Sequence, residues 1–255
     1  MKNHKLNTRD IKNFAQKYHR NLHMLTCYDF QTAQLLNETS VDLILVGDSL
    51  NNVILGEEHT ISAELSTMEL FSKAVKKGAP DKFVIADMPF GTYAILDQAV
   101  LNAIQLFKSS GVEALKVEGA AEHILTFIKR AVEVGIPIMG HIGLTPQSVH
   151  ELGGYFTHGK DDAGQMKCIE QALALEASGV FAIVLECVDE KTSKIITEKL
   201  KIPTIGIGSG KHTTGQVLVI NDLLKMGKNK VPSFCQPIAN LYEMKLELIN
   251  QYLKK

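Results

Sequence analysis

The sequence has no tryptophan and only four cysteines, and its formal net charge at pH 7 is −1. Cys27, Cys168, Cys187 and Cys235 lie far apart and form no C-x-x-C pair, so neither a zinc ribbon nor a disulfide framework is expected. They are typical of free thiols in a reducing compartment. A net charge this close to zero provides no field that favours nucleic acid, so we expect small-molecule partners.

Long apolar runs are also missing. No stretch approaches the roughly 20 residues of a membrane-spanning helix, and the first twenty residues lack the apolar core of a secretory signal. We therefore expect a cytoplasmic protein with no membrane segment. The composition, 45% hydrophobic and 22% charged, is that of a globular protein. The 255 residues match the length of about 250 that is typical of one eight-stranded α/β barrel.

Apolar runs alternate with helical patterns along the whole chain. The runs predict strands over residues 23–26, 43–46, 82–87, 114–118, 136–141, 181–186, 202–207 and 216–220. Helical periodicity predicts helices over 9–19, 30–37, 62–77, 96–110, 121–134, 165–178, 190–200 and 239–253, several of them ending at a glycine. This alternation predicts α/β architecture: one domain, residues 1–255, folded as a closed (β/α)8 TIM barrel with an N-terminal helix. The long loop over 144–164 is a candidate lid.

Three of the predicted strands lead directly to a carboxylate: Asp48, Asp87 and Glu118. Helix capping explains any one of these acids. It explains three less well, because glutamate is a poor N-cap and Met88 and Pro89 follow Asp87 directly. Carboxylates that converge at one end of a barrel need a shared cation, and a set of oxygen ligands suits Mg²⁺.

Further polar residues end the strands: Ser49, Lys116, His141 and Glu186. The set suits an α-oxo acid chelated to a divalent ion, with Lys116 neutralising the substrate carboxylate and the ion stabilising the enolate. Glu186 follows the most apolar strand and is the candidate general base. Two local alternatives stay open: Lys116 can pair with Glu118 on the same strand face, and a lone histidine is more often a core residue than a ligand.

Seven blocks of the sequence resemble, in order, the signature blocks of the ketopantoate hydroxymethyltransferase family. GHIGLTPQS and VLECV are the most specific of them. The blocks are VGDSL at 46–50, ADMPF at 86–90, LKVEG at 115–119, GHIGLTPQS at 140–148, LALEASG at 173–179, VLECV at 184–188 and IPTIGIGSG at 202–210.

The resemblance implies a Mg²⁺-dependent barrel enzyme of the phosphoenolpyruvate/pyruvate type. It would transfer a hydroxymethyl group from its co-substrate 5,10-methylenetetrahydrofolate to 3-methyl-2-oxobutanoate in pantothenate biosynthesis, giving 2-dehydropantoate. The implied ligands of one Mg²⁺ per subunit are Asp48, Asp87 and Glu118. The implied substrate contacts are Asp48, Ser49, Asp87 and Lys116, the proton acceptor is Glu186, and His141 matches a possible folate-side position. The resemblance also implies a homo-oligomer, typically a decamer.

Three alternative functions fit parts of the sequence. A carbon–carbon lyase of the phosphoenolpyruvate/pyruvate type would share the barrel and the acids, but the KKCGH-like nucleophile loop of such enzymes is absent. A metal-dependent hydrolase would need an H-x-H pair after the first strand, where Leu25 stands two residues after His23. A non-catalytic, metabolite-binding barrel would be expected to lack a metal acid or the base, and all four are present.

Overall fold

Each predicted strand forms part of one closed parallel barrel. In the computed structural model, which describes residues 5–254, the strands follow one another round the barrel in sequence order, and the last pairs with the first. They are β1 (Leu22–Thr26), β2 (Leu43–Val46), β3 (Phe83–Asp87), β4 (Ala114–Glu118), β5 (Ile138–Gly143), β6 (Ala182–Glu186), β7 (Thr204–Ile207) and β8 (Gly215–Leu218). The predicted fold class is confirmed.

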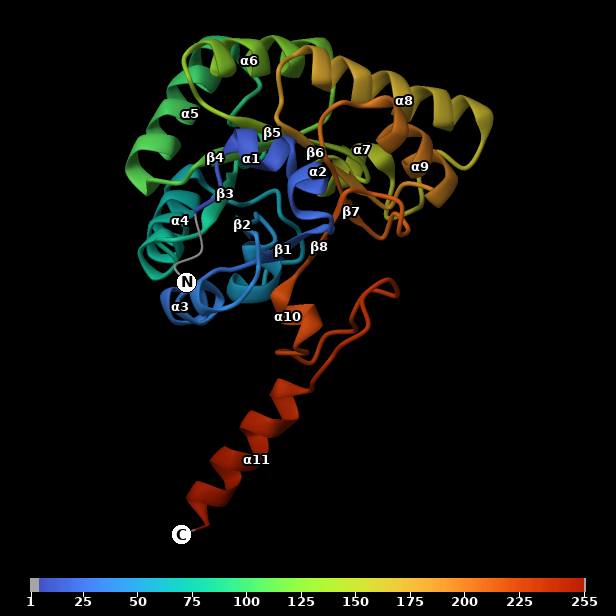
Figure 1. The fold of residues 1–255 in the computed structure, drawn as a ribbon. Coiled ribbons are helices and arrows are strands. Elements are labelled where there is room, and N and C mark those ends of the chain that lie inside the picture. Colours follow the sequence, from blue (N-terminus) through green and yellow to red (C-terminus); the bar gives the residue numbers. More distant parts are fainter. Residues whose placement is uncertain (1–4, 255) are drawn as a thin grey trace.

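Helices surround the barrel (Figure 1). The longer helices that connect strands are α3 (Phe30–Glu38), α4 (Leu65–Gly78), α5 (Leu96–Ser110), α6 (Glu122–Glu133), α8 (Asp162–Ala177) and α9 (Glu190–Lys199). Shorter elements are α1 (Thr8–Lys12), α2 (Phe14–Tyr18), a π-helical turn η1 (Asn51–Leu55), a 3-10 turn η2 (Pro146–Ser148), α7 (Val149–Leu152) and α10 (Ile220–Leu223). The chain ends with α11 (Leu241–Leu253). No helix among residues 5–254 is long and apolar enough to cross a membrane.

Several boundaries differ from the sequence prediction for local reasons. The single helix expected over 9–19 is two helices, because α1 ends at Asn13 with a non-helical backbone. β5 and β7 begin two residues later than expected, just after Pro137 and Pro203, whose nitrogens cannot donate to a neighbouring strand. Gly78 is the last residue of α4 and not its cap; a side chain there would collide with the backbone oxygen of Phe30.

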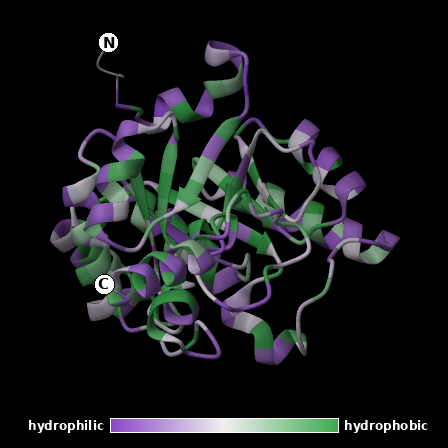
Figure 2. Ribbon diagram, turned by 90° about the horizontal axis from the view of Figure 1, so that it is seen from below, coloured by the Kyte–Doolittle hydropathy of each residue, from purple (hydrophilic) through white to green (hydrophobic). Residues whose placement is uncertain are grey.

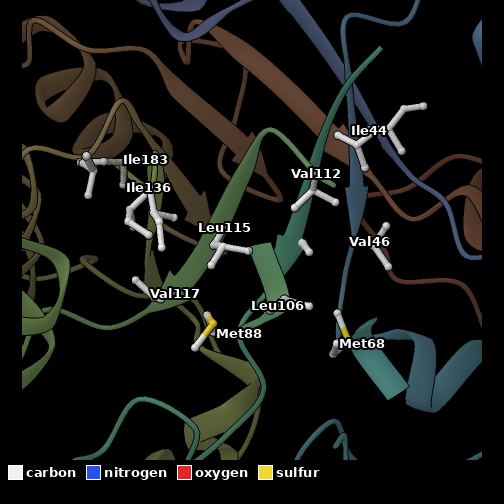
Figure 3. Close-up of a cluster of buried hydrophobic side chains, with 14 of the residues drawn as sticks. Ile44, Val46, Met68, Met88, Leu106, Val112, Leu115, Val117, Ile136 and Ile183 are labelled. Carbon is white, nitrogen blue, oxygen red and sulfur yellow. The ribbon is translucent and has the colours of Figure 1, made fainter. Parts of the chain in front are cut away.

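Two hydrophobic clusters result from the two-residue period of the strands. The inner cluster fills the barrel with residues such as Leu43, Leu45 and Ile85, and Ile11 and Phe14 of α1 and α2 join it. The outer cluster lies between strands and helices and includes Ile44, Val46, Met68, Leu106, Leu115, Val117 and Ile183 (Figure 3). Hydrophobic segments are accordingly concentrated in the strands at the centre of the molecule (Figure 2).

The C-terminal helix α11 projects away from the barrel at the end of an extended segment (Figure 1). None of its residues is buried. Its exposed apolar side chains include Leu248, Ile249 and Leu253. No contact within residues 5–254 explains why these apolar side chains are exposed.

Candidate active site

The inward-facing side chains of four neighbouring strands change from apolar to charged toward the carboxyl ends of the strands. Ile85 is followed two residues later by Asp87, and Val184 by Glu186, on the same face of the strand. The same alternation places Lys116, Glu118 and His141. Together with Asp48 and Ser49, which directly follow β2, these residues line one cavity of about 290 Å³. The structure therefore brings all seven predicted site residues together.

The three predicted metal acids are almost completely buried, and none of them caps a helix. Asp48, Asp87 and Glu118 are each at most 4% exposed. The N-cap residues of α5 and α6 are Ile95 and Ala121, so the helix-capping alternative is wrong.

Asp48 and Asp87 are linked by a hydrogen bond between the backbone of Asp48 and the side chain of Asp87. The Asp48 amide donates to Asp87 Oδ2 at 3.1 Å. Gly47 leaves room for the next site residue, because a Cβ at position 47 would lie 2.8 Å from Ser49 Oγ. Ser49 Oγ is held in turn by the hydroxyl of Tyr28 at 2.8 Å.

Lys116 lies between two of these acids. Its Nζ is 3.0 Å from Asp87 Oδ1 and 3.8 Å from Glu118 Oε1. Burial disfavours the ammonium form, but Asp87, Glu118 and Asp48 outweigh burial and raise the pKa of Lys116. The local Lys116–Glu118 pairing is therefore only part of the arrangement, and the closer partner is Asp87.

His141 connects the metal acids to the candidate base. Its Nδ1 lies 3.3 Å from Glu118 Oε1, and its Nε2 lies 3.4 Å from Glu186 Oε2 without hydrogen-bond geometry. Burial and Lys116 favour the neutral ring, but Glu118 and Glu186 outweigh them and raise the pKa of His141 to about 9. His141 is therefore not an isolated core histidine.

The charges of the site do not balance. Four carboxylates, Asp48, Asp87, Glu118 and Glu186, face two cations, Lys116 and protonated His141, which leaves two negative charges in excess. Burial, together with repulsion from Asp87 and Glu118, raises the pKa of Asp48 well above its ordinary value. Burial also raises the pKa of Asp87, although Lys116 and the backbone amide of Asp48 oppose this effect.

This excess fits a divalent cation. Within residues 5–254, no group of three His, Cys, Asp or Glu side chains is arranged to hold a metal ion. Mg²⁺, however, commonly takes one or two carboxylates and completes its shell with water and substrate oxygens. Asp48 and Asp87 fit this pattern as the residues that would hold the ion, and Glu118 would support it.

Gln147 is a site residue that the sequence analysis missed. Its backbone amide donates to Glu118 Oε2 at 3.0 Å, and its side-chain Nε2 donates to Asp48 Oδ2 at 2.8 Å and to the Met88 oxygen at 3.0 Å. Its Oε1 accepts from the Tyr93 hydroxyl at 2.5 Å. Gln147 belongs to the GHIGLTPQS block, but the contacts depend on the path of η2, which the sequence pattern does not define.

The fold and this charged cavity at the carboxyl ends of the strands define a class of protein, the (β/α)8 barrel enzyme. Solved structures of similar fold include a phosphonopyruvate hydrolase complex with oxalate and Mg²⁺, with a TM-score of 0.63, 11% identity and 98% of each chain covered. They also include 2,3-dimethylmalate lyase, a member of the PEP mutase/isocitrate lyase superfamily, with a TM-score of 0.62 and 13% identity over 97% of this chain and 96% of that one. At this level of identity the likeness shows the fold alone.

The chain belongs to the ketopantoate hydroxymethyltransferase family, whose model matches residues 5–255. It is 49% identical over 231 residues to a 3-methyl-2-oxobutanoate hydroxymethyltransferase of Pseudothermotoga lettingae, covering 90% of this chain and 87% of the relative. It is 44% identical over 242 residues to the protein of the same name in Clostridium beijerinckii, covering 94% and 88%. The chain is therefore a hydroxymethyltransferase, and the lyase, hydrolase and non-catalytic alternatives are wrong.

Proposed function

We propose that the enzyme transfers a hydroxymethyl group from 5,10-methylenetetrahydrofolate to 3-methyl-2-oxobutanoate, giving 2-dehydropantoate in pantothenate biosynthesis. The name of the relatives supports the acceptor and the transferred group. The observation that carries the proposal is the cavity whose acids carry two uncompensated negative charges next to a buried lysine. A divalent cation chelated by an α-oxo acid matches this charge pattern.

Asp48 and Asp87 would hold the ion, with Glu118 supporting it. We take the ion to be Mg²⁺, one per subunit, because the donors are carboxylate oxygens and because a similar fold has been solved with Mg²⁺ and the chelator oxalate. When bound, it supplies Lewis-acid stabilisation of negative charge on the α-oxo oxygen. Lys116 binds the substrate carboxylate, and the half-buried Ser49 hydroxyl offers a further hydrogen bond.

Glu186 accepts the proton from C3 of the substrate. It is the most accessible acid of the site, with 18% of its side chain exposed, whereas the metal acids are closed off from solvent. His141, protonated at neutral pH, lies beside it, with Nε2 3.4 Å from Glu186 Oε2, and attracts its carboxylate. This contact supports an orienting role for His141 and is compatible with a position on the folate side.

Water adds to the one-carbon unit of the folate, its two C–N bonds break, and tetrahydrofolate leaves with a hydrogen on N5 and on N10, so that the carbon is released in the site as formaldehyde. The deprotonated C3 then bonds to this carbon, and the proton held by Glu186 passes to the alkoxide oxygen, which becomes the new hydroxyl. The apolar inner cluster directly below the site limits access of bulk water to the carbon. Limited access of bulk water protects the reactive carbon from side reactions.

We further propose that residues 1–255 are one domain and that the enzyme is a homo-oligomer, with a decamer as the state that the family resemblance implies. The exposed apolar side chains of α11 support an assembly role for that helix. Exposed apolar surface of this extent commonly marks a protein interface.

Formation of 2-dehydropantoate from the two substrates, with and without EDTA, tests the proposal. We expect product with Mg²⁺, its loss after chelation, and its return when Mg²⁺ is added in excess. Product formation that is unaffected by EDTA would contradict the metal, and no product under any condition would contradict the substrate pair.

A further inference from the structure

The cavity that contains Glu186 continues outward to a wall formed by the C-terminal segment. Asp222 of α10, Asn229, Lys230 and Phe234 line this outer half, and Tyr155 lines it from the loop after β5. The steps of the proposed reaction at C3 make no use of these residues. The one-carbon donor must nevertheless reach Glu186 and the substrate through this same cavity.

Asp222 is the acid of this cavity that has no partner. Its side chain makes no hydrogen bond and no ion pair with any residue of the described range 5–254, whereas Asp48, Asp87, Glu118 and Glu186 each have one or more. Burial raises the pKa of Asp222. Its oxygens are therefore free to accept hydrogen bonds from a ligand that enters the cavity, and hydrogen bonds to a charged group are the stronger ones.

Aromatic rings and a cation accompany this carboxylate. Tyr155 and Phe234 are 64% and 40% exposed, so their rings are uncovered, although both contribute to the cavity wall. Lys230 lies on the same wall and is exposed. Flat heteroaromatic ligands bind to such ring faces, and a lysine at the rim attracts anionic groups.

We propose that this outer half of the cavity binds the folate co-substrate, with the Asp222 carboxylate accepting two hydrogen bonds from the pterin ring. The N3–H and 2-amino N–H of a pterin form a planar two-donor edge, which matches a carboxylate as a guanidinium does. Tyr155 and Phe234 contact the ring face, and Lys230 attracts the carboxylates of the glutamate tail. This inference rests on the proposed function, because it assumes a folate donor.

A larger cavity of about 440 Å³ is the competing place for the folate. It is lined by Tyr93, Gln147, Glu151 and His158, among others, but by none of Asp48, Asp87, Lys116 and Glu186. The side chain of Gln147 lines this cavity and is bonded to Asp48. A folate bound there would have the Gln147 amide between its one-carbon unit and the substrate.

The test is the affinity of the Mg²⁺-loaded full-length enzyme, with 3-methyl-2-oxobutanoate bound, for tetrahydrofolate, measured by anaerobic calorimetry. Asp222→Asn is compared with Glu151→Gln, which makes the same carboxylate-to-amide change in the larger cavity. We expect Asp222→Asn to raise Kd on the order of 10- to 100-fold and Glu151→Gln to leave it unchanged. Deuterium exchange at C3 of the oxo acid, measured without folate, should be normal in both variants, which shows that they are folded and loaded.

A folate analogue tests the proposed hydrogen bond between the 2-amino group and Asp222 directly. Tetrahydrofolate with the 2-amino group replaced by methyl should bind the wild type more weakly by a similar factor, and Asp222→Asn should cause little further loss. An unchanged Kd for Asp222→Asn, or weakening by Glu151→Gln instead, would overturn the inference. Turnover of the wild type with 5,10-methylenetetrahydrofolate tests the proposed function separately. If the wild type forms product and Asp222→Asn binds tetrahydrofolate normally, the folate subsite is rejected and the proposed function is retained.

Discussion

Gln147 illustrates how an uncharged residue can organise a charged site. Its backbone and side chain together contact the ends of three strands through Asp48, Met88 and Glu118, and Tyr93 fixes the orientation of its amide. All polar atoms of the side chain are used. The amide orientation follows from the partners, since a carboxylate can only accept and Nε2 can only donate. Partners that orient metal ligands in this way typically affect metal affinity.

We expect Gln147→Ala to weaken Mg²⁺ binding about 10- to 100-fold, because Asp48 loses the donor that sets its direction. Tyr93→Phe, which removes only the hydrogen bond to Oε1, should change Mg²⁺ affinity in the same direction by less. Calorimetric titration of the metal-free protein with Mg²⁺ measures both. Equal affinity in Gln147→Ala and wild type would show that Asp48 is held without Gln147.

The protonation of His141 makes the stability of the folded protein depend on pH. Its pKa is about 9 in the folded protein and about 6.5 in the unfolded chain. The stabilisation it provides is therefore complete below about pH 6.5 and is lost as the pH rises through about 9. In EDTA, the free energy of unfolding of the wild type should exceed that of His141→Gln at pH 6, and the difference should shrink toward pH 9.5. A difference that is constant with pH, measured by urea unfolding, would contradict the protonated state of His141.

Most of the site residues could be predicted because their position depends only on strand order and strand period. Asp87, Glu118 and Glu186 end apolar strands, and the alternation of a strand then fixes which face they occupy. Gln147 and Tyr93 could not be predicted in this way, because they lie in loops whose course is set by tertiary contacts. The unpaired state of Asp222 is likewise visible only when its surroundings are known.

The strands β5 and β6 approach each other closely beside the site. Gly143, the last residue of β5, has a φ of +92°, and a Cβ there would collide with the backbone oxygen of Glu186. This glycine therefore determines where the end of β6, and with it the candidate base, can lie. Gly153 also has a positive φ, of +78°, but open space around it.

We expect Gly153→Ala to lower the free energy of unfolding by about 1–2 kcal/mol, the cost of a left-handed backbone for a residue with a Cβ. Gly143→Ala should lower it further and should also reduce kcat, because the end of β6 must move. Urea unfolding and steady-state kinetics of the two variants separate these effects. Equal losses of stability with unchanged kcat in both would contradict a positioning role for the β5–β6 contact.

The elements themselves were largely predictable, and the exceptions have identifiable causes. All eight strands were expected from apolar runs, and the two that begin two residues late, β5 and β7, begin after a proline. The short helical elements η1 and α10 were not expected, because each contains only four or five residues, which is too few to show a helical period in the sequence. The close contact at Gly78 required knowledge of where α3 lies.

The position of α11 is not explained by contacts among residues 5–254 of a single subunit. Its apolar side chains are exposed and it extends away from the barrel (Figure 1). We expect a chain truncated after Ile238 to form smaller assemblies than the full chain, as measured by light scattering coupled to size exclusion. Because no residue of α11 is buried, circular dichroism should show that the barrel is retained. An unchanged assembly size would exclude α11 from the subunit interface.

The whole site is proposed to remove a proton from C3 of the oxo acid, with Glu186 as the base. The most direct measurement is deuterium incorporation at C3 of 3-methyl-2-oxobutanoate in D₂O, followed by NMR at saturating Mg²⁺ without folate. Glu186→Gln keeps the size of the side chain but cannot accept a proton, so exchange should fall about 10²- to 10⁴-fold, while Mg²⁺ and the oxo acid still bind. Exchange at the wild-type rate in Glu186→Gln would contradict the assignment of the base and the account of the site built on it.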